Sequence, residues 1–147
     1  MYRNSEGYSD PTAGAAMGNI MRDYRQQRKQ ERQHERDLKN RPKVYVVSRY
    51  AGDIETNIAA AKSYCQLVVR KKRIPVASHL LYPQFLDDSI PEQREIGTMC
   101  GLALLACCDE VWCFGTTHSA GMVKELAEAR RLNKPVRHFT ENMEEIR

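Results

Sequence analysis

Two patterns of hydrophobic and polar residues alternate along the chain after residue 42. Short apolar runs rich in Val, Ile and aromatic residues are typical of buried parallel strands. Longer segments with an apolar residue at every third or fourth position are typical of helices that bury one face. The predicted strands are residues 43–48, 74–79, 110–115 and 134–139, and the predicted helices are residues 54–72, 91–108 and 119–133. We expect residues 140–147 to form a polar tail with a short last helix.

This alternation predicts an α/β fold. We expect a small doubly wound, flavodoxin- or Rossmann-like parallel sheet of four or five strands, with helices on both faces. In such a sheet the ligand binds outside the carboxyl ends of the strands, where the strand order reverses. The loops at residues 49–53, 79–88 and 115–121 are therefore expected to converge on one crevice.

The first 40 residues have a different character. Residues 21–40 are almost wholly polar, rich in Arg, Gln and Glu, and lack an apolar stripe, while Asp10 before Pro11 marks a helix start. We expect a polar N-terminal extension at residues 1–40, helical from about residue 11, followed by an α/β domain at residues 41–147. The extension is either a solvated helix or an arm that ties subunits together or binds a partner, and both readings stay open.

Net charge and hydropathy exclude some classes of function. The chain carries +4, with nine basic and six acidic residues in 1–42 and fourteen basic and thirteen acidic residues in 43–147. The α/β part is thus nearly neutral, and we expect no nucleic-acid partner. We expect no membrane association either, because no apolar run approaches the roughly 18 residues of a membrane span, and the polar N-terminus is unlike a signal peptide.

The cysteines indicate the compartment. There are five, an odd number, each in an apolar run and with no Cys-x-x-Cys pair (Cys65, Cys100, Cys107, Cys108 and Cys113). They are interpreted as buried thiols in a reducing cytoplasm, so a cytoplasmic protein is expected. We expect neither a metal site nor a cofactor.

Candidate chemistry lies in the third loop and the helix that follows it. Ser119 and Gly121 precede or open the helix, where free N–H groups attract anions, and Arg49 in the first loop could face a phosphate bound there. Ser119 is equally explained as a plain N-cap. Glu125 follows Gly121 by four residues, on the same helix face, and the glycine leaves room beside the carboxylate. Glu125 is therefore either a pocket residue or an ordinary solvated charge.

The run S-x-G-M-x-x-E-L-x-x-A, followed by K-P-V, resembles the nucleoside 2-deoxyribosyltransferase superfamily, which includes the deoxynucleoside-monophosphate N-glycosidases. The segments VYVVSRYAGD and IPVASHLL resemble the first and second strands of that superfamily. More narrowly, VYVVSRYAGDIETN, ASHLLYPQFLDD and CDEVWCFG resemble small domains of unknown function from bacteria, phages and mobile elements. The likeness spans about residues 43–139 and implies the same α/β fold.

The resemblance implies a set of site residues. Glu125 falls on the nucleophile that attacks the anomeric carbon, Tyr45 on a pocket tyrosine, and Ser119 on the serine that holds a 5′-phosphate. The candidate catalytic residues are Glu125, Tyr45 and Asp109. The candidate substrate-binding residues are Ser48, Arg49, Gly52, His79, Ser119, Gly121 and Met122.

Two positions depart from the family pattern. The superfamily usually has an acid eight residues before Asp109, which handles the nucleobase, but Gly101 stands there. Asp87, Asp88, Glu95 or His79 would then have to donate the proton. In the narrower group an acidic residue is expected at position 120, where this chain has Ala120.

These observations leave three classes of function. The first is an enzyme that cleaves or exchanges the N-glycosidic bond of a nucleoside or nucleotide, with Glu125 as nucleophile. The second is a protein of a phage or mobile element that binds, senses or sequesters a nucleotide signal without turning it over. The third is an interaction protein that acts through its N-terminal arm. The resemblance also implies a homo-oligomer, a dimer or higher.

Overall fold

The computed structural model describes residue 3, residues 5–8 and residues 10–147, in two compact units, Met1–Asn40 and Arg41–Arg147. The start of the predicted extension, at residues 1, 2, 4 and 9, lies outside the described residues. Helix α1 (Pro11–Lys39) begins where Asp10 caps it, since the Asp10 carboxylate accepts hydrogen bonds from the N–H groups of Thr12 and Ala13. None of the residues of α1 is buried.

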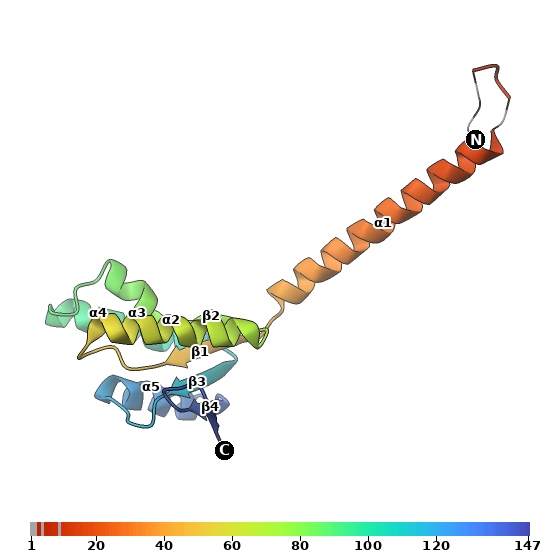
Figure 1. Ribbon diagram of the computed structural model, residues 1–147. Coiled ribbons are helices and arrows are strands. Elements are labelled where there is room, and N and C mark those ends of the chain that lie inside the picture. The colour runs from red at the N-terminus through yellow and green to blue at the C-terminus, as the bar shows by residue number, and fades with distance from the viewer. Residues whose placement is uncertain (1–2, 4, 9) are drawn as a thin grey trace. The chain divides into compact units, whose positions relative to one another are not determined.

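The second unit is built on a five-stranded sheet with the order β2-β1-β3-β4-β5 (Figure 1). The strands are β1 (Lys43–Val47), β2 (Ile74–Val76), β3 (Glu110–Phe114), β4 (Val136–Phe139) and β5 (Glu145–Ile146). The first four are parallel, and β5 pairs antiparallel with β4. The strand order reverses between β1 and β3, so the fold is doubly wound, as the alternating pattern predicts.

Helices cover both faces of this sheet. On one face α2 (Ile54–Arg70) packs against Val44, Val46, Trp112 and Phe114. On the other face α4 (Pro91–Ala106) and α5 (Ala120–Arg131) pack against the alternate strand positions, Tyr45, Val47, Val111 and Cys113. Successive side chains of β1 and β3 thus point to opposite faces of the sheet, and each face has its own apolar layer.

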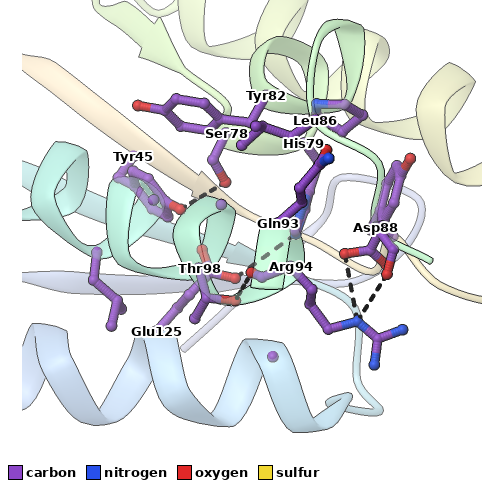
Figure 2. Close-up of a pocket in the computed structure, with 16 residues that line it drawn as sticks. Tyr45, Ser78, His79, Tyr82, Leu86, Asp88, Gln93, Arg94, Thr98 and Glu125 are labelled. Atoms are coloured by element: carbon purple, nitrogen blue, oxygen red, sulfur yellow. Dashed lines mark hydrogen bonds and ion pairs between the residues drawn. The ribbon is translucent and has the colours of Figure 1, made fainter. Parts of the chain in front are cut away.

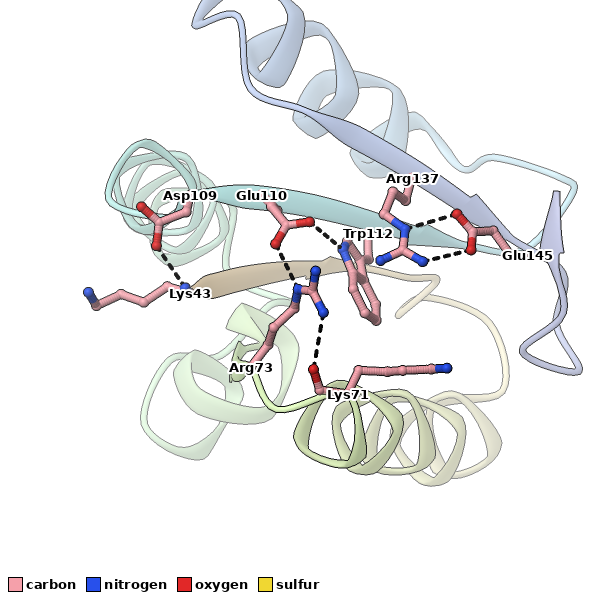
Figure 3. Close-up of polar contacts among 8 residues, drawn as sticks. All are labelled: Lys43, Lys71, Arg73, Asp109, Glu110, Trp112, Arg137 and Glu145. Carbon is pink, nitrogen blue, oxygen red and sulfur yellow. Dashed lines mark hydrogen bonds and ion pairs between the residues drawn. The ribbon is translucent and has the colours of Figure 1, made fainter. Parts of the chain in front are cut away.

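Ion pairs and hydrogen bonds connect neighbouring strands at the amino-terminal end and at one edge of the sheet (Figure 3). Arg137 on β4 forms two hydrogen bonds with Glu145 on β5, at 2.9 and 2.6 Å, and its guanidinium lies 4.5 Å from the ring centre of Trp112. Arg73 is paired with Glu110 at 2.8 Å. The opposite edge strand, β2, has three residues and includes Pro75, which has no N–H to donate.

Two predicted segments are wrong in detail. Residues 77–79 do not continue the second strand, because the chain turns into the short helix α3 (Ser78–Leu81) and the 3₁₀ turn η1 (Tyr82–Gln84). The tail forms no last helix. It turns back at Met143, which has a left-handed φ of 66°, and pairs as β5 with β4.

Candidate functional site

A pocket opens on the face of the sheet that α4 and α5 cover (Figure 2). Tyr45 from β1, Ser78 and His79 from α3, and Glu125 from α5 project into it. Its remaining lining comes mainly from η1 and α4 and consists of Tyr50, Tyr82, Pro83, Leu86, Asp88, Gln93, Arg94, Gly97, Thr98, Gly101, Leu102 and Gly121. Each of the three loops predicted to converge contributes here: Tyr50 comes from the first, several residues between 79 and 88 come from the second, and Gly121 ends the third.

Glu125 is the chemically unusual residue of this pocket. It is a carboxylate with only 7% of its surface exposed, and its Oε2 atom has no hydrogen-bond partner among the described residues. Burial raises the pKa of the Glu125 carboxyl to about 7, and an interaction with the Tyr45 hydroxyl opposes the rise. A buried and unsatisfied carboxylate that faces a pocket is costly to the fold and is typical of a functional group.

His79 is the basic group that lies close to that carboxylate. Its Nε2 atom lies 3.8 Å from Glu125 Oε1, and its ring stacks on Tyr50 with 5.1 Å between the ring centres. Burial lowers the pKa of His79, and the charge of Asp88 opposes this fall. Both shifts favour the uncharged forms of the two groups, a neutral imidazole and a protonated carboxyl.

Gly101 and the Tyr45–Ser78 pair form the floor of the pocket. The two hydroxyl groups are hydrogen-bonded at 2.8 Å, and both residues are buried. A Cβ atom at position 101 would lie 3.2 Å from the Tyr45 hydroxyl and 3.4 Å from Ser78 Oγ. A side chain at position 101 would therefore have to displace one of these hydroxyl groups by a few tenths of an ångström.

A second pocket lies at the reversal of strand order, on the α2 face. Ser48 and Arg49, which follow β1, line it with Thr117 and with Glu141 from beyond β4. The Glu141 carboxylate accepts hydrogen bonds from the N–H and hydroxyl of Thr116, at 2.9 and 3.0 Å. The structure thus places Ser48 and Arg49 in a different pocket from Glu125.

Three predicted binding residues, Ser119, Gly121 and Met122, lie at the amino end of α5, and each has a different environment. The Ser119 hydroxyl accepts a hydrogen bond from the Met122 N–H at 3.3 Å and acts as the N-cap. Gly121 lines the Glu125 pocket, whereas the Met122 side chain is buried in the core. Of these three predicted binding residues, Gly121 is the one that lines the pocket of the carboxylate.

Two further candidates lie away from this pocket. Asp109 precedes β3 at the amino end of the sheet, where its carboxylate accepts a hydrogen bond from the Lys43 N–H at 2.8 Å (Figure 3). This contact ties β1 to β3 and leaves Asp109 at the end of the strand opposite to the pocket. Gly52 is exposed and has a φ of 103°, so its position reflects the turn that leads into α2.

The sequence interpretation missed Ser78 as the partner of Tyr45, and it missed the part of α4 that lines the pocket. Gln93, Arg94 and Thr98 lie on one side of that helix, and Arg94 Nε lies 3.6 Å from Asp88 Oδ1. A weak signal was present, since Arg94 and Thr98 are four residues apart and therefore lie on one face of a helix. Among the proposed proton donors, Asp88 and His79 line the pocket, whereas Asp87 accepts hydrogen bonds from Ser89.

Comparisons with known proteins agree with this fold. A family model described as a domain of unknown function (DUF7768) matches residues 42–139. None of the curated proteins matches the chain. A solved structure of a 2-deoxyribosyltransferase from the psychrotolerant bacterium Bacillus psychrosaccharolyticus is similar, with a TM-score of 0.56 and 17% identity over 67% of this chain and 72% of that one. The predicted deoxyribosyltransferase-like α/β fold is confirmed by this likeness. In the described part of the chain no helix is both long and apolar enough to cross a membrane.

Proposed function

The chain belongs to the DUF7768 family, and because that description assigns no activity, we propose a function from the pocket itself. The protein binds a nucleoside or nucleotide beside Glu125 and cleaves or exchanges its N-glycosidic bond. The buried Glu125 carboxylate, with its unpartnered Oε2, is the observation that carries this proposal. The activity named for the similar bacterial structure, 2-deoxyribosyl transfer, supports it.

The proposed reaction has two displacements. An oxygen of Glu125 attacks C1′ of the sugar, the bond between C1′ and the base nitrogen breaks, and a glycosyl ester of Glu125 forms. The base leaves with a proton from His79 Nε2, which lies 3.8 Å from Glu125 Oε1. Water or a second base then attacks C1′, the ester bond breaks, and the released proton returns to His79.

The pKa shifts of this pair favour a protonated Glu125 and a neutral His79, so the reactive state has to form by transfer of one proton from Glu125 to His79. The state with Glu125 ionised and His79 protonated holds both a nucleophile and an acid, and it differs from the resting state only in the position of one proton. Tyr45, hydrogen-bonded to Ser78, positions the carboxylate from the side of β1. Because Gly101 supplies no carboxylate, we assign the role of acid to His79, whose Nε2 atom lies 3.8 Å from Glu125 Oε1.

The experiment is direct. Purified protein is incubated with a panel of ribo- and deoxyribonucleosides and their 5′-monophosphates, and free base is measured by chromatography. Glu125→Gln should abolish release, while Glu128→Gln, on the same helix but paired with Arg131, should not change it. Intact-mass spectrometry of wild type quenched in acid should show an adduct of one sugar unit. If wild type releases no base from any member of the panel, catalysis is excluded for those substrates.

Gly101 favours a second candidate function, the binding of a nucleotide without turnover. A glycine at the position where the resembling family has an acid would remove the proton donor but leave the pocket open. In that case nucleotides should raise the melting temperature of the protein without release of base, and Glu125→Gln should still bind. A panel that produces neither a thermal shift nor free base would reject both candidates.

A further inference from the structure

Three donor groups gather on the α5 face of the sheet, in a cluster formed by Cys113, His118 and His138. The Cys113 sulfur and one nitrogen from each imidazole lie within 4.8 Å of one another. Cys113 Sγ is 3.6 Å from His118 Nε2, and the two imidazoles are nearly parallel, with ring centres 6.2 Å apart. Cys113 is buried, His138 is partly buried and His118 is exposed, so the cluster is open to solvent on one side.

The fold brings these residues together from separate parts of the sequence. Cys113 on β3 and His138 on β4 are register partners in neighbouring parallel strands and therefore point to the same face of the sheet. The chain leaves β3 through Gly115, whose φ of 109° belongs to the left-handed region that favours glycine. This turn brings His118 back over Cys113, just before α5 begins at Ala120.

We propose that Cys113, His118 and His138 bind a divalent metal ion, Zn²⁺ by the nature of the donors. One thiolate and two imidazoles are ligands that zinc prefers. Around a tetrahedral zinc ion, neighbouring S and N donors stand about 3.3 to 3.6 Å apart, given Zn–S near 2.3 Å and Zn–N near 2.0 Å. The 3.6 Å between Cys113 and His118 already equals such an edge. The other donor pairs lie within 4.8 Å, so binding requires the donors to move closer to the ion, and His118, on an exposed loop, is free to do so.

Binding has a defined chemistry and a local consequence. The Cys113 sulfur exchanges its proton for the metal, the proton goes to solvent, and the imidazoles donate neutral nitrogen lone pairs. Three protein ligands leave a fourth position for water or another oxygen ligand. Because His118 belongs to the loop that leads into α5, the ion would fix this loop against β4. The site does not include Glu125, and it stands whether or not the proposed reaction occurs.

Cobalt substitution tests the site with a direct signature. Full-length protein, free of any affinity tag, is stripped with a chelator under reducing conditions, dialysed, and titrated with Co²⁺ and then with Zn²⁺. We expect one equivalent of Co²⁺ to produce a sulfur-to-cobalt charge-transfer band and the intense visible bands of tetrahedral cobalt, both displaced by Zn²⁺. The absence of the charge-transfer band in wild type at excess Co²⁺ would overturn the proposal and leave a hydrogen-bonded Cys–His cluster.

Variants separate this site from chance binding elsewhere. Cys113→Ser should abolish the charge-transfer band, and His118→Ala, at an exposed loop position that does not endanger folding, should weaken zinc binding by more than about 100-fold. Cys107→Ser and His34→Gln, which change an exposed thiol and an imidazole on α1, should bind like wild type. Wild-type affinity in His118→Ala, or loss of the band in Cys107→Ser, would refute the assignment.

Discussion

The Tyr45 hydroxyl lies 3.2 Å from the place that a Cβ atom at Gly101 would occupy. Position 101 lies inside helix α4, where glycine is unfavourable by about 1 kcal/mol relative to alanine. An alanine there would crowd the hydrogen-bonded hydroxyl groups of Tyr45 and Ser78, and this crowding opposes the gain in helix propensity.

Alanine substitution in α4 tests this relationship. Gly97→Ala should stabilise the protein by up to about 1 kcal/mol, since its Cβ would meet only Leu86, at an ordinary 3.6 Å. Gly101→Ala should fall short of Gly97→Ala by about 1 to 2 kcal/mol, because it crowds two buried hydroxyl groups. Unfolding in guanidinium chloride measures both variants, and equal stabilities would show that the contact with Tyr45 is not restrictive.

Glu125 should give stability a characteristic dependence on pH. Its folded pKa, about 7, exceeds the usual 4.5, so between these values the folded state retains a proton that the unfolded chain has lost. The free energy of unfolding should therefore fall as pH rises from 4.5 to 7, by about 3 kcal/mol at most.

Glu125→Gln removes this titration and isolates its effect. The free energy of unfolding of the variant, minus that of wild type, should be larger at pH 8 than at pH 4.5. Guanidinium unfolding at both pH values measures this difference. Glu128 is the matched control, because its carboxylate is paired with Arg131, which lowers the Glu128 pKa. Glu128→Gln should show no such gain, and a pH-independent offset for Glu125→Gln would mean that Glu125 has an ordinary pKa.

His79 should act on the departure of the base. If His79 protonates the leaving base, His79→Gln should lower kcat by about 10²- to 10⁴-fold for natural nucleosides, with a smaller change in KM. A p-nitrophenyl 2-deoxyriboside, whose leaving group needs no proton, should lose much less rate. Steady-state assays with both substrates make the comparison, and an equal loss for both would assign His79 a positioning role through its stacking on Tyr50.

Ser119 should contribute to stability, and to phosphate recognition if the ligand is a nucleotide. Ser119→Ala removes the N-cap of α5 and should cost about 1 kcal/mol. Asp53→Ala, which removes the N-cap of α2, is the control for stability alone. Calorimetric titration with a nucleoside and its monophosphate should show that Ser119→Ala reduces the preference for the monophosphate, while Asp53→Ala leaves it intact. An unchanged preference would restrict Ser119 to capping.

The α/β unit should fold without the N-terminal helix. Residues 41–147 form a compact unit with an apolar layer on each face of their own sheet. The guanidinium midpoint of the truncated protein should match that of the full chain. Light scattering then gives the number of subunits in both forms. This tests the hypothesis from the sequence that the arm ties subunits together. If the truncated protein has the same number of subunits as the full chain, oligomer formation, if there is any, belongs to the α/β unit.

The parallel sheet and its helices could be predicted because the central strands β1 and β3 are almost continuous apolar runs and because α2 and α5 each have one apolar face. The short helix at Ser78 could not, because its four residues carry no periodic signal. Within the site, the spacing of Gly121 and Glu125 indicated a pocket residue, and the structure places both on the same pocket. The cluster of Cys113, His118 and His138 escaped prediction because strand register, and not sequence spacing, creates it.

Both edges of the sheet are closed to further strands. On one side β2 is only three residues long and contains Pro75, and on the other β5 is two residues long and its Glu145 is held by Arg137. Such edges are poor templates for another chain, which protects the protein against sheet-to-sheet aggregation. We therefore expect any assembly of this protein to form through its helices and loops and not by extension of the sheet.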